Sequence, residues 1–328
     1  MSRLYVVGGR QKERIFRRED EWNLYGSAII LEIDTDSGTA RTCVEYKTPA
    51  DAKADENSSS QFKSGTLVGH MLYACTNTEV LVYRVPSFEL INYVSLPCFN
   101  DLHHVLPAAT GDTLLTVSTG LDMVVRFTPK GEVVEVWDVI QDQPWKRFSQ
   151  AIDYRKVGTT KPHRSHPNFL FELDGQLWVT RFQQRDAMCL SEREKRIEIG
   201  VESPHDGVVN GRRIYFTVVD GRLVTVGAPT LETEATTDFN TMDRPNSLLG
   251  WCRGVLPLTE ERFWVGFTRV RKTRFDQNVL WVKRVFKEGM TTKPTHISLY
   301  DIAQKRCLQE LDLERHGMDV VFSILPVP

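Results

Sequence analysis

A pattern of strands and turns repeats along this chain with a period of about 40 residues. Each copy has an apolar strand, a tight turn, a second apolar strand and two further amphipathic strands. The clearest copy begins at His104 and reads HVLPAAT, the turn GD, TLLTVSTG, MVVRFTP, the turn KG and EVVEVWDV. Alternating β-branched residues and glycine-containing turns are typical of antiparallel hairpins. The complete units begin at Gly65, His104, His166, His205 and Arg253.

A sixth unit is split between the two ends of the chain. The tail supplies one strand, DVVFSILP from Asp319, and the head supplies three, RLYVVGG, SAIILEID and TARTCVEY. Joining them would hide the two edges that an open array exposes. We therefore predict an all-β fold, a six-bladed β-propeller of four-stranded blades that forms a single domain over 1–328. A count of five or seven blades remains open, whereas a two-sheet β-sandwich explains neither the repeat nor the split unit.

Three segments interrupt the repeat, at about 47–60, 140–163 and 271–294. The third belongs to a basic stretch, 269–293, in which aromatic residues are interleaved with lysines and arginines. Such a stretch can be a lid over the channel, a nucleic-acid contact, an oligomer contact or a solvated excursion.

The composition excludes several classes of protein. With 41 basic and 43 acidic residues the formal net charge is -2, which disfavours a nucleic-acid-binding protein. The chain lacks the apolar core of a secretion signal and any membrane-length apolar stretch, and its six cysteines show no CxxC spacing, so we expect a cytoplasmic protein with reduced thiols and no membrane partner. The phosphate-binding patterns GxGxxG and GxxxxGK[ST] and the nucleophile elbow GxSxG are absent, so no nucleotide cofactor is expected.

Polar residues gather just before the first strand of the units. We call these stretches the anchor segments: NDLHH, RSHPN, SPHDG, WCRG and RHGMD. Because the first strand of each propeller blade lines the central channel, residues at its start crowd around one mouth. Five of the eight histidines lie there, namely His103, His104, His166, His205 and His316.

Histidines that converge from three blades predict a metal site. His104, His166 and His205 are the candidate ligands for zinc, iron or copper, with one position left for water or substrate. His103, Asp206 or Asp319 could add a ligand or fix a tautomer. Two alternatives stay open: each histidine bonds backbone between blades, or the histidines act as acid–base groups without a metal.

The candidate catalytic residues are His103, Arg253 and Asp319. The guanidinium of Arg253 suits a carboxylate, phosphate or sulfate group, although a salt bridge to an insertion would serve it equally well. The predicted function is an enzyme that acts on a small polar or anionic molecule by hydrolysis, elimination or oxidation. The alternative is a non-catalytic propeller that presents loops to a protein or carbohydrate partner.

The anchor segments resemble an uncharacterised bacterial family of β-propeller-like proteins. The resemblance rests on Ser203-Pro204-His205, on Arg253-Gly254-Val255 followed by RFWVGFTRVRKTRF, and on THISLYDIAQKRCLQELDL with the closing VVFSILPVP. It implies a fold and no established activity. One blade, Asp101 to Val139, resembles arylsulfotransferase-like propellers, which place a histidine near the channel after a similar LHH start. The calcium ligands of gluconolactonase-like propellers are not evident.

Overall fold

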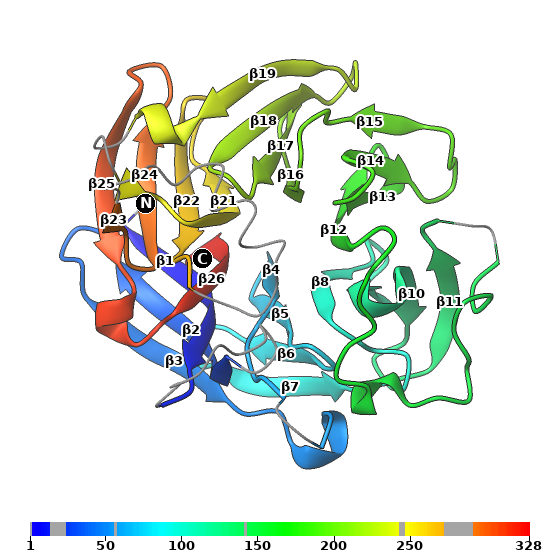
Figure 1. The fold of residues 1–328 in the computed structure, drawn as a ribbon. Helices are drawn as coiled ribbons and strands as arrows, with labels where there is room; N and C mark the ends of the chain where they lie inside the picture. Colours follow the sequence, from blue (N-terminus) through cyan, green and yellow to red (C-terminus); the bar gives the residue numbers. More distant parts are fainter. Residues whose placement is uncertain (1, 14–23, 56–57, 141–142, 243–246, 272–290) are drawn as a thin grey trace.

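In the computed structural model, which describes residues 2–13, 24–55, 58–140, 143–242, 247–271 and 291–328, the chain forms six four-stranded antiparallel blades around a central channel (Figure 1). This confirms the predicted six-bladed β-propeller. The first five blades follow the chain in order. The first blade consists of β4 (Ser64–Val68), β5 (Met71–Cys75), β6 (Val80–Arg84) and β7 (Glu89–Val94), and the second of β8 (Leu102–Pro107), β9 (Leu114–Ser118), β10 (Met123–Phe127) and β11 (Val133–Asp138). The third consists of β12 (Pro167–Leu173), β13 (Gln176–Arg181), β14 (Asp186–Cys189) and β15 (Arg196–Glu198), the fourth of β16 (Pro204–Asn210), β17 (Arg213–Val218), β18 (Arg222–Gly227) and β19 (Thr233–Asp238), and the fifth of β21 (Trp251–Pro257), β22 (Arg262–Thr268), β24 (His296–Asp301) and β25 (Arg306–Asp312).

The sixth blade joins the two ends of the chain. Its strand order is β26 (Val320–Pro326), β1 (Arg3–Gln11), β2 (Tyr25–Asp34) and β3 (Ala40–Tyr46). β26 runs antiparallel to β1, with Leu4 opposite Pro326 and Gly9 opposite Val320. The predicted closure by the N- and C-terminal strands is thus confirmed.

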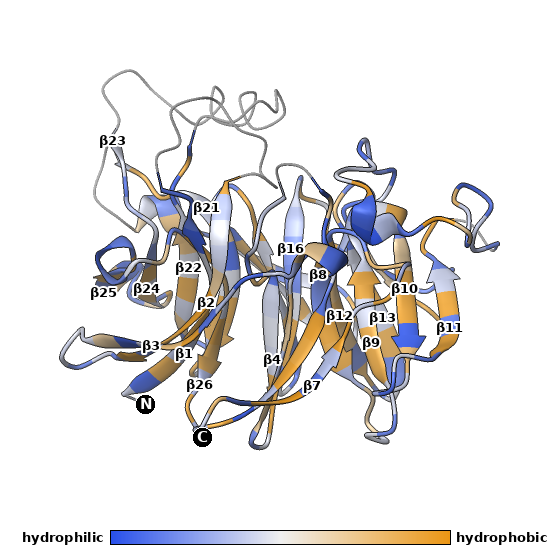
Figure 2. Ribbon diagram, turned by 90° about the horizontal axis from the view of Figure 1, so that it is seen from below, coloured by the Kyte–Doolittle hydropathy of each residue, from blue (hydrophilic) through white to orange (hydrophobic). Residues whose placement is uncertain are grey.

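Strand β1 shows why its residues form a blade. Leu4, Tyr5, Val6 and Val7 are all fully buried, because both faces of the strand are covered. Side chains alternate between the two faces of a strand. Leu4 and Val6 accordingly join a cluster with Trp264 of β22, whereas Tyr5 and Val7 join one with residues of β5 and β6. Such apolar sandwiches between adjacent blades hold the ring together, and Figure 2 shows hydrophobic stretches running along the strands.

The six inner strands, β4, β8, β12, β16, β21 and β26, contact one another in sequence around the channel. Several begin with a register shift against the next strand, between Leu102 and His104 in β8 and between His205 and Val208 in β16. Asp101, His166 and Asp206 have φ of 50°, 54° and 58°. Bulges and left-handed residues re-aim side chains, so the simple alternation of a strand fails at these points.

The connections between blades carry the remaining short elements. The segment from β3 to β4 contains the 3-10 helix η2 (Ala50–Ala52), and the segment from β11 to β12 contains η4 (Tyr154–Lys156). Most of the third insertion, 272–290, lies outside the described residues. The roles considered for this basic stretch, a lid over the channel among them, therefore fall largely on residues that are not described. No helix in the described part of the chain is long and apolar enough to span a membrane. The other short elements are η3 (Thr119–Leu121), η5 (Phe239–Thr241), η6 (Glu314–His316), β20 (Ser247–Leu248) and β23 (Thr291–Thr292).

Candidate metal centre

Three histidines from three successive blades converge at one end of the channel. One ring nitrogen each of His103, His166 and His205 lies within 4.8 Å of the other two. The ring centroid of His103 is 4.9 Å from that of His166 and 6.0 Å from that of His205. His103 belongs to β8, His166 directly precedes β12 and His205 belongs to β16. The anchor segments predict that His104, His166 and His205 converge in this way. In the structure, His103 takes the position expected for His104.

His104 points to a different part of the channel. Its ring stacks on Phe169 with the centroids 3.8 Å apart. Its Nε2 is 3.2 Å from the hydroxyl of Thr66, and its Nδ1 accepts from the backbone N–H of Leu170 at 3.3 Å. The ring also lines a channel cavity of about 340 Å³ that includes later residues of all six inner strands. The bulge between Leu102 and His104 turns the side chain of His103 toward the other two histidines. The adjacent side chains of His103 and His104 therefore point to different parts of the channel.

The hydrogen bonds fix which nitrogen of His103 is available. Its Nδ1 lies 2.9 Å from the carbonyl oxygen of Asp101, which can only accept, so Nδ1 carries the proton and Nε2 the lone pair. In His205 the Nε2 is buried and has no hydrogen-bond partner among the residues that the structure describes. Burial lowers the pKa of His103 to about 3, and burial together with the charge of Arg253 lowers the pKa of His205 well below its usual value. Both rings are therefore neutral near pH 7, which is the form that binds metal ions.

A chain of hydrogen bonds sets the tautomer of His166. The hydroxyl of Thr160 donates to the carbonyl of Gly120, so its oxygen must accept the Nε2–H of His163 at 3.4 Å. That leaves the lone pair of His163 on Nδ1, which faces Nδ1 of His166 at 3.1 Å. Nδ1 of His166 must then donate, and its Nε2 keeps a lone pair. Partners of this kind orient metal-binding histidines and raise their basicity.

The backbone around His166 is held by one buried carboxylate. Asp122 accepts the backbone N–H groups of Arg164, Ser165 and His166 at 2.9, 3.0 and 2.8 Å, and it is ion-paired with Arg147 at 2.9 Å. Three consecutive donors on one carboxylate stabilise the left-handed conformation of His166, which a residue with a side chain rarely adopts. Asp122 therefore positions His166 without touching its ring.

We expect Asp122→Ala to weaken metal binding by roughly 10- to 100-fold, the range found when partners of metal ligands are removed. The fold should survive with a stability reduced by several kcal/mol, because the three N–H groups lose a charged acceptor. Metal titration and urea unfolding measure the two effects separately. Asp153→Ala is a suitable control, because Asp153 also accepts a backbone N–H, that of Arg155 in η4, and is ion-paired with the same arginine. Metal affinity equal to that of the unmodified protein would contradict the positioning role.

Two cations lie over one aromatic ring beside the histidines. Nζ of Lys63 is 5.6 Å and the guanidinium carbon of Arg253 is 5.2 Å from the centroid of Phe322. Lys63 is ion-paired with Asp101 at 3.1 Å. Burial, the largest single influence, raises the pKa of Asp101, but Lys63 and the other basic groups nearby together hold the pKa of that carboxyl well below its usual value. Arg253 forms no ion pair with any described carboxylate, and its Nε is buried without a partner. The bulge of β21 between Cys252 and Val255 places Arg253 here.

The two other predicted carboxylates link strands. Asp319 accepts the backbone N–H of Gln11 at 2.7 Å and lies 3.4 Å from Arg271, so its carboxylate contacts the closing blade and the segment that follows β22. Asp206 accepts from the hydroxyl of Thr217 at 2.6 Å and from the N–H of Gly254 at 2.8 Å. Burial raises the pKa of Asp206 to about 6. Neither Asp206 nor Asp319 is part of the candidate metal-binding group formed by the three histidines.

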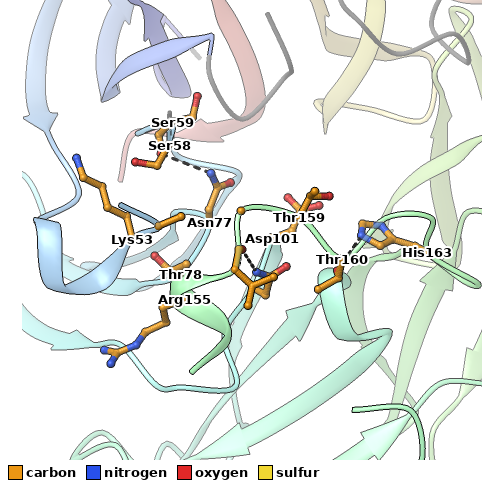
Figure 3. Close-up of a pocket in the computed structure, with 14 residues that line it drawn as sticks. Lys53, Ser58, Ser59, Asn77, Thr78, Asp101, Arg155, Thr159, Thr160 and His163 are labelled. Atoms are coloured by element: carbon orange, nitrogen blue, oxygen red, sulfur yellow. Dashed lines mark hydrogen bonds between the residues drawn. The ribbon is translucent and has the colours of Figure 1, made fainter. Parts of the chain in front are cut away.

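Sequence reasoning missed Lys63, Asp101 and His163 as site residues. His163 and His166 form a His-x-x-His pair, and Lys63 precedes the Gly65 unit as the anchor segments precede the others. Asp101 and His163 also line a second cavity, between the insertion that carries η2 and the one that carries η4 (Figure 3). In Figure 3, Ser58 and Ser59 lie on one side of it and Thr160 and His163 on the other, with Asp101 between them.

Comparison with known proteins supports the fold. No protein-family model and no curated protein matches the chain. A solved Bacteroides caccae protein of unknown function is 12% identical with a TM-score of 0.61, over 100% of this chain and 99% of that one. A putative 6-phosphogluconolactonase from Bacteroides fragilis is 9% identical, with a TM-score of 0.54 over 94% and 82% of the two chains. The Cps50 (Swd1) β-propeller domain of Myceliophteria thermophila is 10% identical, with a TM-score of 0.50 over 90% and 85%. These neighbours agree with the resemblance to uncharacterised bacterial propellers.

Proposed function

We propose that the protein is an enzyme whose active centre is a metal ion bound by His103, His166 and His205, and that it acts on a small anionic molecule. One observation carries the proposal: three neutral, largely buried imidazoles from three blades present ring nitrogens to one point. The unpaired Nε2 of His205 adds to it, because a buried nitrogen without a partner is costly unless a ligand satisfies it.

The donor set fits a transition metal. In a tetrahedral zinc site with bonds of about 2.0–2.1 Å, the ligand nitrogens lie about 3.3 Å apart. The nitrogens of the three histidines are separated by up to 4.8 Å, so binding requires the rings to turn inward slightly. Three histidines leave one position for water or substrate, as catalytic sites do and structural sites do not. Bound there, the ion would activate water or polarise a carbonyl.

The charge of the site favours an anionic substrate. The three ligands are neutral, the charge of Lys63 is balanced by Asp101, and Arg253 has no carboxylate partner among the described residues. A divalent ion beside Arg253 therefore leaves several uncompensated positive charges in a partly buried place. A carboxylate or phosphate of the substrate would neutralise them, with the guanidinium as a fork-shaped donor.

Elemental analysis of the protein purified without chelator or histidine tag tests the proposal. We expect about one equivalent of metal per chain, and the metal-free protein should bind Co²⁺ with the absorption of a tetrahedral nitrogen site. Zinc would favour hydrolysis or elimination, whereas iron or copper would favour oxidation. Absence of any bound ion together with no response to Zn²⁺ or Co²⁺ would sink the proposal and leave the non-catalytic propeller as the better interpretation.

A further inference from the structure

A cavity beside the three histidines has an unusual lining. Among the described residues that line it there are four cations and no carboxylate; the cations are Lys63, Arg253, Arg269 and Arg271. Lys63 joins this cavity to the metal centre, because it is ion-paired with Asp101 at 3.1 Å and the carbonyl oxygen of Asp101 accepts from Nδ1 of His103 at 2.9 Å. Arg253 lies with Lys63 over the ring of Phe322 in the same lining, so the cavity lies beside the histidine cluster.

Three of the four cations form ion pairs with carboxylates of the described part of the chain. Lys63 is ion-paired with Asp101. Arg269 and Arg271 share Glu314, each at 2.7 Å, and Arg271 also reaches Asp319. Lys63, Arg269 and Arg271 and the three carboxylates that pair with them together carry no net charge. Among the described residues, Arg253 is the cation of this lining left to pair with a ligand, and its buried Nε has no acceptor there.

The other residues of the cavity lining indicate two further features of a ligand. Leu24, Tyr25, Val320 and Phe322 form a buried apolar cluster on one side of the cavity. Gln61 is 2% exposed and lines the same cavity, and its buried side-chain oxygen has no hydrogen-bond partner in the described part of the chain. An amide oxygen can only accept, so its missing partner is a donor such as a hydroxyl or amino group.

We propose that the substrate is a small hydroxylated organic anion with an apolar body. Its carboxylate lies between Arg253 and the metal ion, its apolar part lies against Phe322, and its hydroxyl donates to Gln61. This inference rests on the proposed function and adds the class of substrate to it.

Binding of 2-hydroxyisovalerate to the metal-loaded protein tests the inference, with isovalerate and inorganic phosphate as the comparison probes. Isothermal titration should show 2-hydroxyisovalerate binding about fivefold more tightly than isovalerate, since the hydroxyl adds one hydrogen bond. Arg253→Ala should weaken it by tenfold or more, because a charge-assisted bond is lost, and Arg253→Lys should restore part of the affinity. Gln61→Leu should remove the preference for the hydroxyl. Arg84→Ala, at an exposed pair with Glu89, is the control for net charge.

The outcomes separate the two proposals. If the protein takes up no metal ion, the proposed function fails. If it takes up the ion but binds none of the three probes, or binds phosphate more tightly than both carboxylates, the metal centre stands and this inference is overturned. Equal affinity of the two carboxylates likewise overturns the role of Gln61, and with it the hydroxylated class.

Discussion

His103→Ala is expected to abolish metal retention, whereas His104→Ala, the adjacent substitution, should leave it intact. The lone pair of His103 on Nε2 is directed toward the site because its Nδ1–H donates to the carbonyl of Asp101. Both nitrogens of His104 have partners, and its ring stacks on Phe169. We expect the affinity for Co²⁺ to fall by more than about 100-fold in His103→Ala, beyond the loss caused by removing a ligand's partner.

The pair of variants also controls for folding. His104→Ala removes a fully packed ring and should lower the free energy of unfolding by roughly 2–4 kcal/mol, as other large-to-small changes in cores do. His103→Ala should cost less, because the ring of His103 lies against the polar rings of His166 and His205 and not against an apolar core. Loss of metal in His104→Ala with retention in His103→Ala would reverse the assignment and restore the ligand set that the sequence predicts.

Removal of residues 319–328 is expected to unfold the whole ring. Four apolar residues of β26 are buried, Val320, Val321, Phe322 and Ile324. Burial of such a side chain contributes about 1.5–3 kcal/mol, so together they account for roughly 6–12 kcal/mol before the lost pairing with β1 is counted. That is comparable with the entire stability of an ordinary domain, about 5–15 kcal/mol. Circular dichroism and gel filtration should report an unfolded or aggregated chain.

Removal of 327–328 alone is the matched control, because these residues follow the end of β26. We expect a cooperative urea transition close to that of the full chain. A synthetic peptide of residues 318–328 should partly restore the fold of the truncated protein, since it supplies the missing strand. A truncated protein with an unchanged transition would show that packing between blades closes the ring without β26.

The fold could be predicted because the strands of a propeller produce a recognisable repeating pattern in the sequence. Each strand either alternates apolar and polar residues or is apolar throughout, and the hairpins carry glycine-containing turns. The C-terminal strand completes a four-stranded unit only with the N-terminal strands. The blade order, the split sixth blade and the inner position of the anchor segments follow from that pattern alone.

The site could be predicted only in outline. Convergence of histidines from three blades follows from the repeat, but the choice between His103 and His104 depends on a bulge that the pattern LHHVLP does not reveal. Insertions are harder still, because nothing in the repeat indicates that the segment before β12 returns to the channel and brings His163 with it. Asp319 shows what an anchor segment leaves undetermined: its place there predicts a site residue, and the structure places its carboxylate on the backbone N–H of Gln11.

Pairing of β26 with β1 has a consequence for synthesis of the chain. The strand β1 leaves the ribosome early, yet the residues that cover its inner edge, 320–326, are made about 310 residues later. At about 5–20 residues per second, that edge stays uncovered for roughly 15–60 s. Open apolar strand edges attract other chains, so this interval is when the nascent protein is most exposed to aggregation and most in need of a chaperone. A chain permuted to begin in the segment between β3 and β4 would make all six blades from contiguous sequence and remove that delay.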